Sequence, residues 1–129
     1  MADFSIAVKL VLSHEGGYSS GDPNDPGGET NFGIAKRWFP ELDIKNLTVD
    51  DAVAIYRRKY WTSNMESLAD QALANCALDC AVNQGPGIAQ QFLANFKNLR
   101  EFQLARLLRY ASLGKTQFNH AWFQRVLDV

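Results

Sequence analysis

Residues 13–34 read SHEGGYSSGDPNDPGGETNFGI and contain six of the nine glycines of the chain and two of its four prolines. Glycine adopts positive φ angles easily, and proline fixes its own φ and restricts the residue before it, so this stretch cannot continue a helix. It nevertheless carries several acidic, hydroxyl and aromatic side chains. Catalytic and binding residues concentrate on loops that a rigid scaffold holds in place. We therefore interpret residues 13–34 as the candidate active-site loop.

Helices are expected on both sides of this loop. Apolar residues recur at helical spacing from Phe4 to Glu15, with Asp3 as the N-cap, and Gly16-Gly17 ends that helix. Further helices are expected over residues 34–39, 48–61, 67–83, 87–94 and 98–112, and from 116 or 119 onward, with a small hairpin around residues 18 and 30–32. The predicted fold is mainly α: one domain over residues 1–129 with a Gly-rich active-site loop and at most a small β-hairpin.

Composition is that of a globular protein. With 129 residues, 47% of them hydrophobic and 21% charged, the chain is long enough for one domain with a real core. The formal net charge of -1 argues against a nucleic-acid binder, although residues 97–129 hold six basic and two acidic side chains. We interpret those basic side chains as a solvated helix face; the alternative is a surface for an anionic partner. No stretch approaches the ~20 apolar residues of a membrane span, so no insertion into a membrane is expected.

The cysteines and histidines do not predict a metal site. Cys76 and Cys80 are four residues apart on one predicted helix face, which favours two buried thiols over a disulfide. The two histidines, His14 and His120, lie far apart in the sequence, and no pair of cysteines or histidines has the spacing of zinc ligands. No metal and no cofactor are expected.

Glu15, Asp25 and Thr30 predict glycoside hydrolysis. Glu15 stands at the C-terminal end of the first predicted helix, where the helix dipole disfavours the ionised carboxylate, as suits a general acid. The alternative is a solvated residue at a helix end. Asp25 supplies a second carboxylate, and the Thr30 hydroxyl can hold a water. In the later helices, Asp79 is either a satisfied core carboxylate or, as we favour, a support for the loop.

The sequence also resembles a known family. The strings HEGGY at 14–18 and DPxDxGGxTxxGI at 22–34 closely resemble the signature of glycoside hydrolase family 108, whose members are peptidoglycan-cleaving N-acetylmuramidases of phage endolysins and bacterial autolytic proteins. Three later segments also match: IYR at 55–57 with YW at 60–61, DxAVNxG at 79–85, and Trp122 with Arg125-Val126. The resemblance implies that Glu15 is the catalytic acid. The order of the three residues is similar to that in phage lysozymes, which implies that Asp25 and Thr30 position the water. The alternative is that Asp25 stabilises the oxocarbenium charge, so inversion and retention at the anomeric carbon both stay open.

We therefore expect a lysozyme-like muramidase that cleaves the β-1,4 bond between N-acetylmuramic acid and N-acetylglucosamine, acts in host lysis and works as a monomer. Its partner would be the glycan strands of bacterial peptidoglycan, with Tyr18, Trp61, Asn83 and Gln84 lining the groove. Trp61 and its neighbouring tyrosines also fit a core. Family members commonly have a longer C-terminal region, so residues 97–129 are interpreted as a shortened peptidoglycan-binding region. The alternatives are a lytic transglycosylase and a non-catalytic peptidoglycan-binding protein.

The expected site of action is the cell wall. The first residues lack a basic region followed by an apolar run, so no secretory signal peptide is predicted. We expect synthesis in the cytoplasm and release through a holin-like pore.

Overall fold

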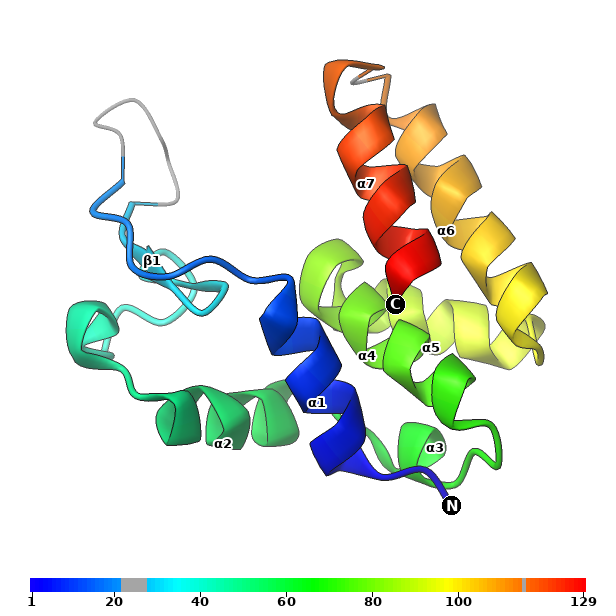
Figure 1. Cartoon of the computed structure of the whole chain (residues 1–129), viewed down its shortest axis with the longest axis horizontal. Coiled ribbons are helices and arrows are strands. Elements are labelled where there is room, and N and C mark those ends of the chain that lie inside the picture. The colour runs from blue at the N-terminus through cyan, green and yellow to red at the C-terminus, as the bar shows by residue number, and fades with distance from the viewer. Residues whose placement is uncertain (22–27, 115) are drawn as a thin grey trace.

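The computed structural model describes residues 1–21, 28–114 and 116–129, without the side chains of residues 116–118. Its elements follow in the order α1 (Phe4–Ser13), β1 (Thr30–Asn31), β2 (Ile34–Ala35), the short 3-10 helix η1 (Ile44–Asn46), α2 (Val49–Lys59), α3 (Ser63–Glu66), α4 (Gln71–Gln84), α5 (Pro86–Asn95), α6 (Leu99–Ser112) and α7 (Thr116–Asp128) (Figure 1). The mainly α fold with one small hairpin is confirmed.

Most helices begin where a side chain caps the first turn. The Asp3 carboxylate accepts a hydrogen bond from the backbone of the first turn of α1, and Asn98 does the same for α6. Thr48 and Asp51 form a reciprocal capping box at the start of α2, with distances of 3.0 and 3.1 Å. Pro86 occupies the first turn of α5, where its missing N–H costs nothing. The starts of α1, α2 and α6 confirm the predicted ones, and α5 begins one residue before the predicted range of 87–94.

Two predicted elements differ from the structure. The expected helix over residues 34–39 is wrong, because Ile34 and Ala35 pair with β1 in an antiparallel hairpin. The two residues between the strands, Phe32 and Gly33, have φ angles of 53° and 75°, as a type I′ hairpin turn requires. The helix expected over 67–83 begins instead at Gln71, because the Asp70 side chain caps it there, and α3 precedes it. Long-range pairing and a local cap decide these two boundaries.

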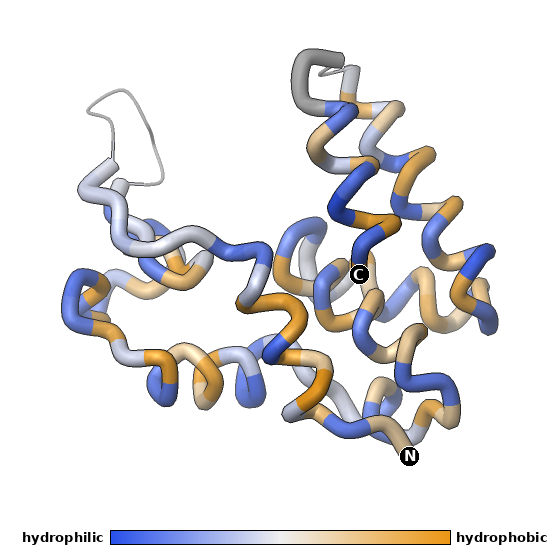
Figure 2. The backbone as a smooth tube through the Cα atoms, viewed as in Figure 1, coloured by the Kyte–Doolittle hydropathy of each residue, from blue (hydrophilic) through white to orange (hydrophobic). Residues whose placement is uncertain are grey.

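Helix α4 lies at the centre of the core. It packs against α1 on one side and against α5 and α6 on the other (Figure 1). Its buried side chains include Leu73, Leu78 and both cysteines, and the hydrophobic stretches of α1 and α4 lie next to each other in Figure 2. Cys76 and Cys80 are free, buried thiols, which confirms the prediction. Burial raises the pKa of the Cys80 thiol to about 12.

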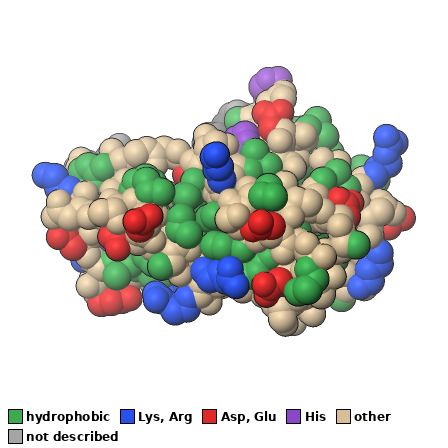
Figure 3. Space-filling model, turned by 60° about the horizontal axis from the view of Figure 1, so that its bottom comes forward, with side chains coloured by type: hydrophobic (Ala, Val, Ile, Leu, Met, Phe, Trp, Pro, Cys, Tyr) green, Lys and Arg blue, Asp and Glu red, His purple; other side chains and the backbone are tan. Residues whose placement is uncertain are grey.

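The hairpin and α2 form one side of the molecule, and the antiparallel pair α6 and α7 forms the other, with α1 between them (Figure 1). Asn31 ties the hairpin to η1, because its Nδ2 donates a hydrogen bond of 3.1 Å to the buried carbonyl of Ile44. Acidic, basic and apolar side chains are interspersed on the face shown in Figure 3. Within the described ranges, every helix is too short or too polar to cross a membrane.

Candidate active site

Glu15 lies where α1 ends and the chain turns toward the hairpin. Its backbone N–H bonds to the carbonyl of Leu12, and the next residue, Gly16, accepts a hydrogen bond of 3.2 Å from the N–H of Phe32. These two bonds hold the Glu15 backbone between helix and hairpin. The Glu15 side chain is only 13% exposed. The alternative of a solvated helix-end residue is therefore wrong.

The hairpin turn packs directly on the Glu15 carboxylate. A methyl group placed on Gly33 would lie 2.6 Å from Oε2 of Glu15 and 2.9 Å from the hydroxyl of Tyr56. Only a glycine fits, because any larger residue would displace the carboxylate, and because φ is positive at this position. The Tyr56 hydroxyl donates a hydrogen bond of 2.6 Å to the carbonyl of Phe32 and so fixes the turn. Burial, with the nearby Glu15 charge, raises the pKa of Tyr56 far above its usual value, so this donor stays protonated.

The other carboxylate oxygen of Glu15 is held by an arginine from the last helix. Nη2 of Arg125 donates a hydrogen bond of 2.6 Å to Oε1 of Glu15, 110 residues away in the sequence. The two carboxylate oxygens thus differ: Oε1 is paired with a cation, whereas Oε2 faces the hairpin turn. The sequence had pointed to the helix end as the main influence on the Glu15 carboxylate. In the structure, a guanidinium group and the hairpin turn also surround it.

A fully buried carboxylate anchors Arg125. Oδ1 of Asp79 accepts bonds of 2.8 and 3.0 Å from Nη2 and Nε of Arg125, and Oδ2 accepts one of 2.8 Å from Arg106. Although burial opposes their charge, Asp79 holds the pKa of both arginines above the ordinary value. Two carboxylates and two guanidinium groups thus form one continuous network through α4, α6 and α7. Asp79 is thus a satisfied core carboxylate, as the alternative held, and through Arg125 it is also linked to Glu15, as the preferred interpretation held.

Composition and residue spacing did not indicate that Arg106 and Arg125 belong to the site. Both belong to residues 97–129, whose basic side chains were interpreted as a solvated face; for these two residues that interpretation is wrong. The sequence did carry a signal for Arg106. It lies four residues after Phe102 and four before Tyr110, both buried, so all three residues share the inner face of α6.

The other predicted site residues have different locations. Thr30 lies in β1, where it pairs with Ala35, and its backbone also exchanges two hydrogen bonds with Ser19. Tyr18 is exposed beside this hairpin and donates a hydrogen bond of 2.7 Å to Glu29. Thr30 is thus on the strand that leads into the turn at Glu15. Asp25 lies outside the described residues.

Trp61 belongs to the core. Its side chain is 8% exposed and packs edge-on against Phe4, with ring centroids 5.4 Å apart. Phe4 opens α1 and Glu15 follows its end, so Trp61 lies about 15 Å along the helix from the site. The prediction that Trp61 lines the groove is therefore wrong, since a buried ring has no face for a sugar. The core alternative for Trp61 is confirmed.

Asn83 and Gln84 both lie at the end of α4, but their side chains have different hydrogen-bond partners. Nδ2 of Asn83 donates hydrogen bonds of 3.0 and 3.1 Å to the carbonyl and carboxylate of Asp79, and its side chain is exposed. Oε1 of Gln84 accepts a bond of 2.7 Å from Nε of Arg106. Gln84 therefore completes the buried network, which corrects its expected place in the groove. Asn83 connects that network to the surface.

A cavity opens beside Glu15. Its volume is about 490 Å³, and its walls come from the hairpin turn and the segment after β2, the end of α2, and the junction of α4 and α5. Gly33, which contacts Glu15, lines it together with Tyr60 and Asn83. Burial, followed by the Glu15 charge, raises the pKa of Tyr60. Among the residues that the structure describes, no group of three or more His, Cys, Asp or Glu side chains is placed to hold a metal ion.

Comparison with known proteins agrees with this geometry. The model of the family described as glycosyl hydrolase 108 matches residues 8–85, more than half of the chain and the part that holds Glu15, Gly33 and Asp79. The chain belongs to the glycosyl hydrolase 108 family. This glycosyl hydrolase 108 protein is therefore a glycoside hydrolase, and its substrate class is peptidoglycan. The family membership expected from the HEGGY signature is confirmed.

A solved structure shares the fold of this glycosyl hydrolase 108 protein. It is entitled "Structure of Brucella abortus SagA", is 30% identical, and superposes with a TM-score of 0.76 over 95% of this chain and 88% of that chain. No curated protein matches the sequence. The likeness to SagA extends beyond residue 85, so it includes the helices that supply Arg106 and Arg125.

Proposed function

We propose that this glycoside hydrolase is an N-acetylmuramidase that hydrolyses the β-1,4 bond between N-acetylmuramic acid and N-acetylglucosamine. The observation that carries the proposal is the asymmetric setting of the Glu15 carboxylate, which packs on Gly33, a residue of the cavity wall. Oε1 is held by Arg125, and Oε2 lies against Gly33, which lines the cavity. Because Oε1 is engaged by Arg125, we assign the transferable proton to Oε2.

In this mechanism Glu15 donates its Oε2 proton to the leaving oxygen as the glycosidic bond breaks. The carboxylate left behind is stabilised at Oε1 by Arg125, which Asp79 holds in place. We assign to Asp25 and Thr30 the positioning of the attacking water on the opposite face of the sugar. A water between two carboxylates needs them ~6.5–9.5 Å apart and gives inversion at the anomeric carbon. We propose lysis of the bacterial wall as the cellular role.

Digestion of purified peptidoglycan tests the proposal. Mass spectrometry of the fragments released by the wild-type enzyme should show reducing N-acetylmuramic acid ends. Glu15→Gln should lower the rate by on the order of 10²–10⁴, the usual contribution of a general acid. Glu41→Gln makes the same chemical change at an exposed position and should leave the rate unchanged.

Two results would overturn the proposal. Anhydro-muramic acid ends would make the protein a lytic transglycosylase, which needs no attacking water. Unchanged activity of the Glu15→Gln enzyme would remove Glu15 from the reaction.

A further inference from the structure

An exposed tryptophan stands at the mouth of the cavity beside Glu15. Trp38 follows the hairpin and lines this cavity, and its side chain is 70% exposed. Exposure of an indole is costly, because a tryptophan ring buries 150–250 Å² when it is covered. The guanidinium group of Arg37 lies 4.9 Å from the centre of the Trp38 ring and helps to hold it in place. Trp38 thus offers a largely uncovered, oriented aromatic ring.

Another residue that lines the same cavity offers a hydrogen-bond acceptor. Asn83 comes from the end of α4, and its Nδ2 is engaged by Asp79. Its Oδ1 is the amide atom that can accept a hydrogen bond from a ligand. The remaining lining is mostly apolar and includes Phe39 and Pro86. The cavity therefore combines apolar and aromatic walls with a few polar groups, among them Asn83, the composition typical of a small-molecule site.

We propose that Trp38 and Asn83 form a subsite for one N-acetylated sugar ring of the glycan strand, next to the bond at Glu15. The apolar face of the sugar would stack on the Trp38 ring, and a hydroxyl or N-acetyl N–H would donate to Oδ1 of Asn83. The subsite is continuous with the catalytic residue, because Gly33 lines the cavity and contacts Glu15. This inference rests on the proposed function, since it takes the same glycan as ligand.

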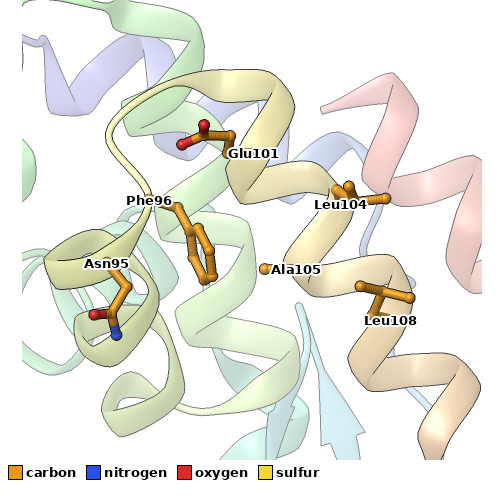
Figure 4. A pocket seen from close by; sticks show the side chains of 6 residues that line it. All are labelled: Asn95, Phe96, Glu101, Leu104, Ala105 and Leu108. Atoms are coloured by element: carbon orange, nitrogen blue, oxygen red, sulfur yellow. The ribbon is translucent and has the colours of Figure 1, made fainter.

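A second cavity on the molecule does not have this character. It has a volume of about 340 Å³ and lies between the end of α5 and α6, where Phe96, Leu104 and Leu108 line it (Figure 4). Leu104 and Leu108 are exposed. Glu15 and the residues that contact its carboxylate in the described part of the chain, Gly33 and Arg125, do not line this cavity. Its apolar residues therefore serve as a control for the removal of exposed hydrophobic surface.

Binding is best measured without turnover, in the Glu15→Gln background. The probe is a purified tetrasaccharide of alternating N-acetylglucosamine and N-acetylmuramic acid, titrated by calorimetry. Adding Trp38→Ala should raise the dissociation constant about tenfold, which corresponds to a loss of ~1.4 kcal/mol of binding free energy. Trp38→Phe, which keeps a flat ring, should weaken it less than about threefold, and the Leu108→Ala control should leave it unchanged. Circular dichroism confirms that each variant is folded.

Tryptophan fluorescence locates the ligand. Trp61 is buried, and Trp122 stacks on Tyr110, so a sugar at the subsite should change chiefly the emission of Trp38. The change should be seen in the Glu15→Gln protein and be lost when Trp38→Phe is added. An unchanged dissociation constant for Trp38→Ala, or an emission change that persists in Trp38→Phe, would overturn the subsite. Failure of the proposed function would appear separately, as activity retained by Glu15→Gln.

Discussion

Replacing Asp79 by asparagine should destabilise the protein strongly. Asp79 and Arg106 are fully buried, and Arg125 is largely buried. Asparagine has the same shape but only one acceptor oxygen. In either orientation of the amide, its NH2 group faces one of the two guanidinium groups, donor against donor. Removing one partner of a buried ion pair typically costs about 3–5 kcal/mol, since the remaining charge is left without water or a counter-ion.

That cost is a large part of the stability of a domain, which is typically about 5–15 kcal/mol. Urea unfolding followed by circular dichroism measures it. With a slope of about 2 kcal/mol per molar urea, the midpoint of unfolding should fall by about 2 M. The matched control is Asp50→Asn, which makes the same change on the exposed first turn of α2 and should shift the midpoint by less than about 0.3 M.

Glu15→Gln provides the second comparison. The Glu15 carboxylate is at the edge of the network, and its removal leaves Arg125 paired with Asp79. We expect this variant to lose activity and to lose clearly less stability than Asp79→Asn, because Arg125 keeps a carboxylate partner. A midpoint for Asp79→Asn within about 0.5 M of the wild-type value would refute the reasoning, because it would show that the two arginines do not depend on the Asp79 charge.

Two further predictions concern the hairpin turn and the core thiols. Gly33→Ala should cost about 1–2 kcal/mol through its positive φ and should also lower kcat at least tenfold, because the new methyl group displaces the Glu15 carboxylate. The control is Gly114→Ala, at a φ of 70° with open space around it, which should lose stability in urea unfolding but keep its activity. Equal kcat values for the two variants would contradict the placement of Gly33 against the catalytic carboxylate. Cys76 and Cys80 should resist a thiol reagent at pH 8 in the folded protein and react once the protein is unfolded in urea. The reason is that burial raises the pKa of both thiols, that of Cys80 to about 12. Rapid reaction of both thiols in the native state would contradict their burial.

Much of the fold follows from interactions between residues close in the sequence. The caps at Asp3, Thr48 and Asn98 act within three residues, so their sequence patterns predicted the helix starts. The buried face of α4 is visible as a repeat of small and apolar residues. The HEGGY signature identified the family and the candidate acid, Glu15, before any geometry was known.

Where the sequence misled, pairing or burial at long range was responsible. The segment after Gly33 reads as a short helix, but it pairs with β1 because the turn brings the two strands together. The sequence pattern led to Trp61 as a groove residue and gave no signal for Trp38. Packing against Phe4 buries Trp61, whereas Trp38 is left exposed at the cavity. Burial depends on what the rest of the chain covers, so a local pattern does not reveal it.

The sequence by itself determined the mainly α fold, the family and the loop that carries Glu15. Only the tertiary structure decided what surrounds that carboxylate. Arg125 reaches Glu15 across 110 residues, and Arg106 reaches Asp79 across 27. A charged residue can occupy the same position in the helical repeat whether its side chain faces water or a buried partner, so the repeat does not reveal its surroundings. The electrostatics of Glu15 are therefore set by the packing of α6 and α7 against α4, because only packing excludes the water that would otherwise solvate those charges.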